Sequence, residues 1–236
     1  MRRFAQTVGM NRKIPALFAL TLVLSFALAI IVNSYMPQNS KAVADTQKCV
    51  YLTFDDGPSD KVTPAILDIL KEENVPATFF IVGVNAEKRP ELLKRAVREG
   101  HTLGVHSYSH KYKEIYASVD ALIKDIEACN EIIKGVTGKY SKIYRFPGGS
   151  FTIAPELKAA VTAKGYEYVD WNASFRDCEL TLATEDDLYN AAVSTVAYPD
   201  RVVMLAHDGA GKTSTCGALK KVIKYFKDKN YVFKAF

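Results

Sequence analysis

Histidine is scarce in this sequence, and three of its four histidines stand where they could do chemistry. His106 and His110 lie four residues apart in the segment HSYSH, and His207 directly precedes Asp208. If HSYSH is helical, its two imidazoles fall on one face and could bind the same metal ion. A pair of ordinary surface histidines is the alternative interpretation.

Two adjacent carboxylates, Asp55 and Asp56, follow a short apolar run and precede a Gly-Pro turn. Adjacent carboxylates repel each other unless a cation or a base shares their site. Asp56, His106 and His110 together would offer two imidazoles and one carboxylate, with coordination positions left open. That donor set suits Zn²⁺ or another divalent transition metal. Acidic capping of a helix N-terminus is the alternative explanation of the carboxylates.

These residues need a scaffold that brings distant segments together. Short apolar runs, rich in β-branched and aromatic residues, alternate with amphipathic helical patterns. The expected strands are residues 50–54, 77–82, 102–105, 143–146, 166–171, 202–206 and 231–235, and the expected helices are 63–73, 90–99, 119–133, 155–164, 185–197 and 218–229. This alternation predicts an α/β fold with a parallel sheet, either doubly wound or closed into a small (β/α) barrel.

The polar residues favour the barrel, because they follow the carboxyl ends of several different strands. Besides the residues already named, Arg145 ends the fourth expected strand and Asp170 ends the fifth. Catalytic residues of (β/α) barrels gather at those ends. No GxGxxG or GxxxxGK[ST] motif follows an expected strand, which removes the usual signs of nucleotide binding. We therefore expect an irregular barrel of seven or eight strands.

The first 44 residues differ in character from the rest. They carry five basic residues and no acidic one. Without these five, 26 of the 31 basic residues remain, which equals the 26 acidic residues, so residues 45–236 have no formal net charge. A neutral body argues against nucleic-acid binding. Residues 14–32 contain no charge and follow Arg12 and Lys13. We expect a transmembrane anchor there, a tether to residue 44, and a catalytic domain at 45–236 outside the cell; a signal peptide cleaved after Ala44 is the alternative.

The four cysteines show no CxxC spacing of a zinc knuckle. Cys178 follows the fifth expected strand, and Cys216 falls in the expected loop after the sixth. A disulfide between them would join two loops on the same face, so we expect this bond, with Cys49 and Cys129 reduced. Four free thiols are the alternative, since cysteine is also common as a buried residue.

Four segments occur in the order TFDDGPS (53–59), HSYSH (106–110), RFPGGS (145–150) and MLAHD (204–208). With these motifs the chain resembles the polysaccharide deacetylase family, the NodB-homology domain of carbohydrate esterase family 4, over roughly residues 48–236. The resemblance implies an irregular (β/α) barrel. It also implies metal-dependent removal of acetyl groups from chitin-like polymers or peptidoglycan, and in some members from acetylated xylan.

The resemblance also implies a role for each motif residue. Asp55 is similar to the general base that deprotonates the attacking water, and Arg145 to the arginine that pairs with it. Asp56, His106 and His110 are similar to the metal ligands, and His207 to the general acid. The metal is expected to be Zn²⁺, with Co²⁺, Ni²⁺ or Mn²⁺ as alternatives.

One further partner and the substrate contacts are also expected. An aspartate orients the acidic histidine in the family, and Asp177 is favoured over Asp170 for that role. Pro147, Gly148 and Trp171 are the expected substrate contacts, with strand packing as the alternative for Trp171. A backbone N–H near Gly148 is expected to hold the oxyanion. His101 is expected to be structural.

The chain is therefore predicted to be a monomeric, membrane-anchored hydrolase that removes N-acetyl groups from cell-wall polysaccharide, with peptidoglycan as the first candidate. Two alternatives remain open. An O-acetyl esterase of the xylan type could use the same site, because attack by water on an acetyl carbonyl serves esters and amides alike. A non-catalytic wall-binding barrel is the second alternative.

Overall fold

The computed structural model describes residues 47–180 and 182–236. The chain divides into the units Met1–Thr46 and Gln47–Phe236, and the second unit contains the sheet and its helices. The anchor expected at residues 14–32 and the rest of the segment 1–44 lie outside the described residues. Among the described helices, none has the length and apolar character needed to cross a bilayer.

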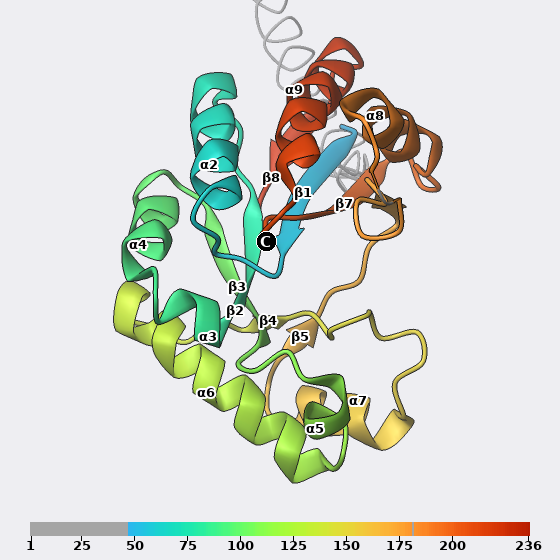
Figure 1. The fold of residues 1–236 in the computed structure, drawn as a ribbon. Coiled ribbons are helices and arrows are strands. Elements are labelled where there is room, and N and C mark those ends of the chain that lie inside the picture. Colours follow the sequence, from blue (N-terminus) through green and yellow to red (C-terminus); the bar gives the residue numbers. More distant parts are fainter. Residues whose placement is uncertain (1–46, 181) are drawn as a thin grey trace, which may run out of the picture. The chain divides into compact units, whose positions relative to one another are not determined.

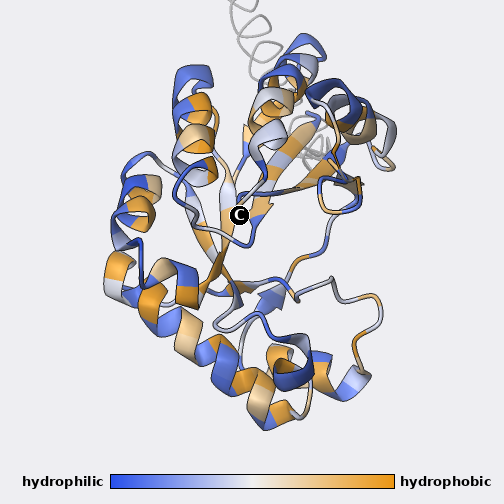
Figure 2. Ribbon diagram, in the orientation of Figure 1, coloured by the Kyte–Doolittle hydropathy of each residue, from blue (hydrophilic) through white to orange (hydrophobic). Residues whose placement is uncertain are grey.

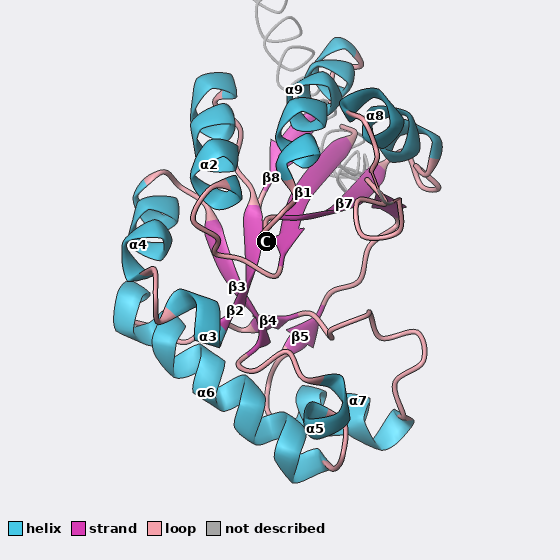
Figure 3. Ribbon diagram, viewed as in Figure 1, coloured by secondary structure: helices cyan, strands magenta, loops and turns pink. Residues whose placement is uncertain are grey.

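Parallel strands form one sheet, ordered β5-β4-β3-β2-β1-β7-β6 with β8 paired to β1 (Figures 1 and 3). The strands are β1 (Cys49–Asp55), β2 (Thr78–Val82), β3 (Thr102–Ser107), β4 (Ile143–Tyr144), β5 (Glu167–Tyr168), β6 (Ala173–Ser174), β7 (Arg201–His207) and β8 (Val232–Lys234). All seven expected strands form, and the parallel sheet is as predicted. The short strand β6 was not expected.

The sheet is a half-barrel of parallel strands, so the expected irregular α/β barrel is confirmed in its coarser form. β5 and β6 lie at opposite edges, and no ladder joins them among the described residues. The chain crosses the gap instead: Val169 donates its N–H to the Tyr144 carbonyl at 2.8 Å, and Asn172 donates to the Val203 carbonyl at 3.1 Å. The two edge strands β5 and β6 are each two residues long, and the sheet stays open between them.

Helices surround the outer face of the sheet (Figure 1). They are α2 (Val62–Glu73), α3 (Gly83–Ala86), α4 (Pro90–Arg98), α5 (Tyr112–Ile115), α6 (Val119–Thr137), α7 (Pro155–Ala163), α8 (Glu185–Ser194) and α9 (Thr213–Asp228). The six expected helices form, and the single-turn helices α3 and α5 are additional. The sequence sets the ends of α6: the Ser118 hydroxyl accepts the Ala121 N–H at 3.1 Å, and Gly138 ends the helix with φ 78°.

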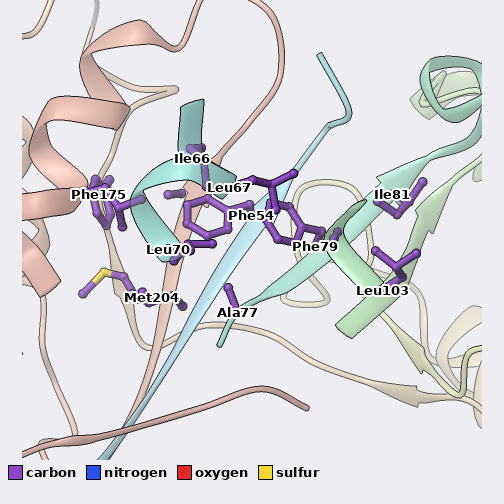
Figure 4. Packing of buried hydrophobic residues seen from close by; sticks show 14 of the residues in the cluster. Phe54, Ile66, Leu67, Leu70, Ala77, Phe79, Ile81, Leu103, Phe175 and Met204 are labelled. Atoms are coloured by element: carbon purple, nitrogen blue, oxygen red, sulfur yellow. The ribbon is translucent and has the colours of Figure 1, made fainter. Parts of the chain in front are cut away.

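The larger core lies between the sheet and these helices. Phe54 of β1 and Phe79 of β2 stack at 5.2 Å between ring centroids, and Leu67 and Leu70 of α2 pack beside them (Figure 4). The hydropathy colouring shows apolar stripes on the helices, as a buried helix face requires (Figure 2). Alternate residues of the strands point to the other face, where Phe80 belongs to a smaller apolar cluster.

The expected Cys178–Cys216 disulfide does not form, and all four cysteines are free. Cys216 was expected in a loop, but α9 already begins at Thr213, so Cys216 lies in its first turn and is half-buried. Cys178 is exposed and lines the same cavity as His207. Cys49 and Cys129 are buried and reduced, as expected.

Candidate active site

The carboxyl ends of four strands bring the expected functional residues together. Asp55 ends β1 and is the register partner of His207, which ends β7. His106 lies on β3, and Arg145 directly follows β4. A cavity of about 370 Å³ opens among them, lined by Asp55, Asp56, His106, His110, Tyr112, Gly148, Trp171, Ser174, Arg176, Asp177, Cys178, Glu179, Leu205 and His207.

Asp56, His106 and His110 converge as the sequence suggested. Oδ1 of Asp56 lies 3.1 Å from Nε2 of His110 and 3.5 Å from Nε2 of His106. The His106 Nδ1–H donates to the Arg145 carbonyl at 2.8 Å, which turns Nε2 of that ring towards the carboxylate. Burial opposes ionisation of Asp56, but hydrogen bonds from both imidazoles outweigh it and hold the pKa of this carboxyl well below its usual range. The ligand atoms of all three lie within 4.8 Å of one another and could hold one metal ion.

The HSYSH segment is not helical, so the helical explanation of the histidine pair was wrong. His106 lies near the end of a strand, and His110 lies in the following loop with φ 56°. The His110 N–H donates to the Ser107 hydroxyl at 2.8 Å. Asp125 of α6 accepts hydrogen bonds from the Ser107 hydroxyl at 2.6 Å and from the N–H groups of residues 108 and 109 at 2.8 and 2.9 Å. This carboxylate therefore shapes the loop that carries the second imidazole.

Arg145 is fully buried and holds Asp55 in place. Its Nη1 donates to Oδ1 of Asp55 at 2.9 Å and to the Thr53 hydroxyl at 2.8 Å, while its Nε donates to the Val169 carbonyl at 2.9 Å. The guanidinium also lies 4.1 Å from the ring centroid of Phe80. Burial lowers the pKa of Arg145, and the charge of Asp55 opposes that shift. Asp55 thus has a fixed cationic partner on the side away from the cavity.

His207 is paired with Asp177, and Asp170 is used elsewhere. The His207 Nδ1–H donates to Oδ1 of Asp177 at 2.7 Å, and the backbone N–H of His207 donates to Oδ2 at 2.9 Å. Burial alone would lower the pKa of His207, but its hydrogen bond to Asp177, its interaction with the Cys178 side chain and the charge of Asp177 raise that pKa to about 11. Asp170 accepts hydrogen bonds from the N–H and the hydroxyl of Ser150.

Comparison with known proteins is consistent with this arrangement. A family model described as polysaccharide deacetylase matches residues 42–169. The chain belongs to the polysaccharide deacetylase family. It is therefore an enzyme of the hydrolase class, and the predicted resemblance is confirmed.

Relatives and solved structures support the same assignment. The deacetylase is 32% identical over 198 residues to the peptidoglycan-N-acetylmuramic acid deacetylase PdaA of Bacillus subtilis, covering 80% of this chain and 70% of PdaA. It spans 66% of the length of another curated Bacillus subtilis relative. The structure of a Streptococcus mutans CE4 esterase superimposes with TM-score 0.75 and 33% identity, covering 80% of this chain and 86% of that one. The catalytic domain of a peptidoglycan N-acetylglucosamine deacetylase from Eubacterium rectale gives TM-score 0.75 and 36% identity, covering 80% and 89%.

The rim of the deacetylase cavity carries two of the three expected substrate contacts. Gly148 and Trp171 line the cavity, whereas Pro147 does not and instead has its carbonyl held by the Tyr116 hydroxyl at 2.8 Å. Gly148 has φ 80°, a conformation that glycine adopts without strain. Phe151, which sequence reasoning missed, is 66% exposed and packs edge-on against Trp171 at 5.6 Å between ring centroids.

Sequence reasoning also missed several residues around the site. Tyr112 and Cys178 line the cavity, and Asp125 holds the loop of His110. Asp208 is fully buried, and burial raises the pKa of its carboxyl to about 7. For Cys178 the signal was its place directly after Asp177. His101 is buried and accepts the Ala77 N–H on Nδ1 at 3.2 Å, a structural role as expected.

Proposed function

We propose that this enzyme hydrolyses N-acetyl groups on the amino sugars of peptidoglycan. The observation that carries the proposal is the pairing of Asp55 with Arg145 and of His207 with Asp177 at the wall of one cavity. A carboxylate held by a permanent cation suits a base, and an imidazole held by a carboxylate suits an acid. The peptidoglycan substrates named for PdaA and for the Eubacterium rectale domain support the choice of polymer.

A divalent metal ion, with Zn²⁺ as the first candidate and Co²⁺, Ni²⁺ or Mn²⁺ as alternatives, fits Asp56, His106 and His110. Two imidazoles and one carboxylate are a common donor set for Zn²⁺ in hydrolases, and their ligand atoms converge here. The hydrogen bond from His106 Nδ1 to a backbone carbonyl fixes the orientation that such a ligand needs. When bound, such an ion polarises a carbonyl and makes water more acidic.

Asp55 and His207, which both line the cavity, would handle the two protons of the reaction. Asp55 would accept a proton from the attacking water as the water oxygen bonds to the acetyl carbon. His207 would donate its proton to the nitrogen as the carbon–nitrogen bond breaks, so that acetate and a free amine are released. Asp177 would keep His207 protonated beforehand, and the backbone N–H of Gly148, at the cavity wall, is the proposed oxyanion donor.

The proposed location is the outer face of the cytoplasmic membrane, with residues 14–32 as the anchor. The uncharged run and the basic residues before it support this orientation. Protease treatment of intact cells tests it: the catalytic domain should be degraded while a cytoplasmic marker survives. Protection of the domain until lysis would contradict the proposed orientation.

Acetate release from purified polymers tests the activity. We expect release from peptidoglycan, loss of that release in a chelator, and recovery with Zn²⁺. An O-acetyl esterase is the second candidate, supported by the Streptococcus mutans structure described as a CE4 esterase. Preferential release from acetylxylan would favour that candidate. Absence of release from peptidoglycan, chitooligosaccharide and acetylxylan by the metal-loaded enzyme would favour a non-catalytic wall-binding role.

A further inference from the structure

The active-site cavity contains a second group of metal-binding side chains, centred on Cys178. The ligand atoms of Asp56, Cys178 and His207 all lie within 4.8 Å of one another. Cys178 is exposed and lines the cavity together with His207. The group shares only Asp56 with the histidine site, so it adds a sulfur and a nitrogen donor in the same cavity.

The surroundings of His207 leave one ring nitrogen free for a metal. Its Nδ1–H donates to Asp177 at 2.7 Å, so Nε2 is the nitrogen available to a ligand. A carboxylate on the far nitrogen is the usual support of a metal-binding imidazole in proteins. Asp177 is itself fixed by the Thr215 hydroxyl at 2.9 Å, so the ring orientation is held from the protein side.

Asp56 can serve both groups because a carboxylate has two oxygens with free lone pairs. Its Oδ1 faces the two histidines at 3.1 and 3.5 Å. Carboxylates commonly bridge two ions that lie roughly 3.5–4 Å apart in two-metal hydrolases. A thiolate, an imidazole and a carboxylate form a donor set that favours Zn²⁺ and other soft divalent ions over Mg²⁺ or Ca²⁺.

We propose that Asp56, Cys178 and His207 form a second, inhibitory site for a soft divalent cation such as Zn²⁺. Binding there would release the protons of the Cys178 thiol and the His207 imidazole to solvent, and metal–sulfur and metal–nitrogen bonds would replace them. His207 could then not donate a proton, and the ion would occupy part of the cavity. The inhibitory effect rests on the proposed function; the binding itself does not.

Cobalt titration of the full chain tests the binding, because thiolate ligands give Co²⁺ an intense near-ultraviolet charge-transfer absorption that imidazole and carboxylate ligands do not give. In the wild type we expect this absorption with the second equivalent of Co²⁺, and two ions per chain by elemental analysis. Cys178→Ser should bind one ion and lack the absorption. Cys178→Ala should do the same if the serine variant fails to fold.

Cys216→Ser is the matched control, because Cys216 belongs to neither group of metal-binding residues found in the described part of the chain. It should keep both ions and the thiolate absorption. One ion per wild-type chain, or a thiolate absorption that persists in both Cys178 variants, would overturn the proposed site.

Measuring acetate release as the Zn²⁺ concentration increases tests the proposed inhibition. Activity of the wild type and of Cys216→Ser should rise with the first equivalent of Zn²⁺ and fall at higher concentrations. In Cys178→Ser the falling limb should move to about ten-fold higher Zn²⁺ or beyond, since one of three ligands is lost. An unmoved falling limb would overturn the inhibitory role. Absence of activity in every form would count against the proposed function alone, because the cobalt titration still decides the site.

Discussion

Two carboxylates of the site lie beside cationic partners, and the partners differ in whether they can lose a proton. Arg145 is fully buried beside Asp55 and is a cation at all accessible pH values. His207 remains partly exposed beside Asp177 and can exchange its proton with a substrate in the cavity. Because only His207 can give up its proton, it is the proposed acid, and Asp55 beside the permanent cation Arg145 is the proposed base.

Replacing Asp177 with asparagine should move the alkaline limb of the rate profile to lower pH. In the wild type the pKa of His207 is raised to about 11, so the imidazole stays protonated through neutrality. Without the charge of Asp177 the pKa should fall towards its ordinary value, and the acid should be lost closer to neutral pH. The pH dependence of kcat/KM measures the shift. Asp170→Asn is the control, since Asp170 contacts Ser150; an alkaline limb unchanged in Asp177→Asn would contradict the pairing.

Replacing Asp208 with asparagine should change how stability depends on pH. Burial raises the pKa of Asp208 to about 7, so the native state binds a proton more tightly than the unfolded state. The protonated Asp208 carboxyl therefore stabilises the wild type at acidic pH, and this stabilisation is lost as pH rises through roughly 4 to 7. At ~1.4 kcal/mol per pKa unit the loss is a few kcal/mol at most. Asp208→Asn lacks this pH-dependent contribution to stability.

Chemical denaturation at pH 5 and pH 8, in a chelator, measures the effect of Asp208→Asn. As pH rises from 5 to 8, the unfolding free energy of Asp208→Asn should increase relative to that of the wild type. Asp228→Asn is the control, because that carboxylate is exposed on α9 and pairs with Lys224 at 2.8 Å. Equal pH slopes in Asp208→Asn and wild type would show that Asp208 does not bind the proton.

At the scale of elements, long periodic segments were predictable and short ones were not. β1 and α2 carry clear patterns of burial over seven and twelve residues, and both were expected. β6 is two residues long and has no period to detect. The spacing of His106 and His110 suggested a helix, but the loop conformation depends on Asp125, whose contact no local pattern reveals. The motif residues were identified by type and order, and the partner Asp177 was favoured over Asp170 through the family resemblance.

Asp125 is therefore expected to support metal binding from α6 without touching the metal. Asp125→Ala removes the acceptors for the Ser107 hydroxyl and for two backbone N–H groups, so the loop of His110 should loosen. Loss of such supporting contacts typically costs about 10–100-fold in metal affinity. Competition with a chelator measures the affinity. Asp120→Asn, also on α6 but exposed, should bind metal as the wild type does, and equal affinity in both variants would exclude the supporting role.

For the molecule as a whole, the half-barrel collects its functional groups at one end of the sheet. Asp55, His106 and His207 each lie at the end of a different strand, and the order of those strands could not be read from local patterns. The segment 169–172 crosses the open side and carries Trp171 to the rim of the cavity. We therefore expect a polymer longer than the cavity to contact the aromatic pair formed by Trp171 and Phe151.

Phe151→Ala should accordingly weaken the use of long substrates more than short ones. The side chain is 66% exposed and is held against Trp171, so one ring face can be covered by a sugar. Burying part of an aromatic ring contributes on the order of 1 kcal/mol, which corresponds to a roughly five-fold rise in KM for chitooligosaccharides. We expect kcat and metal content to stay unchanged, and KM for an N-acetylated monosaccharide to change little. Tyr198→Ala removes a similarly exposed aromatic that, unlike Phe151, is not paired with Trp171, and should leave both KM values unaltered. Equal KM effects on the monosaccharide and the oligosaccharide would place the role of Phe151 inside the reaction centre rather than on the path of the polymer.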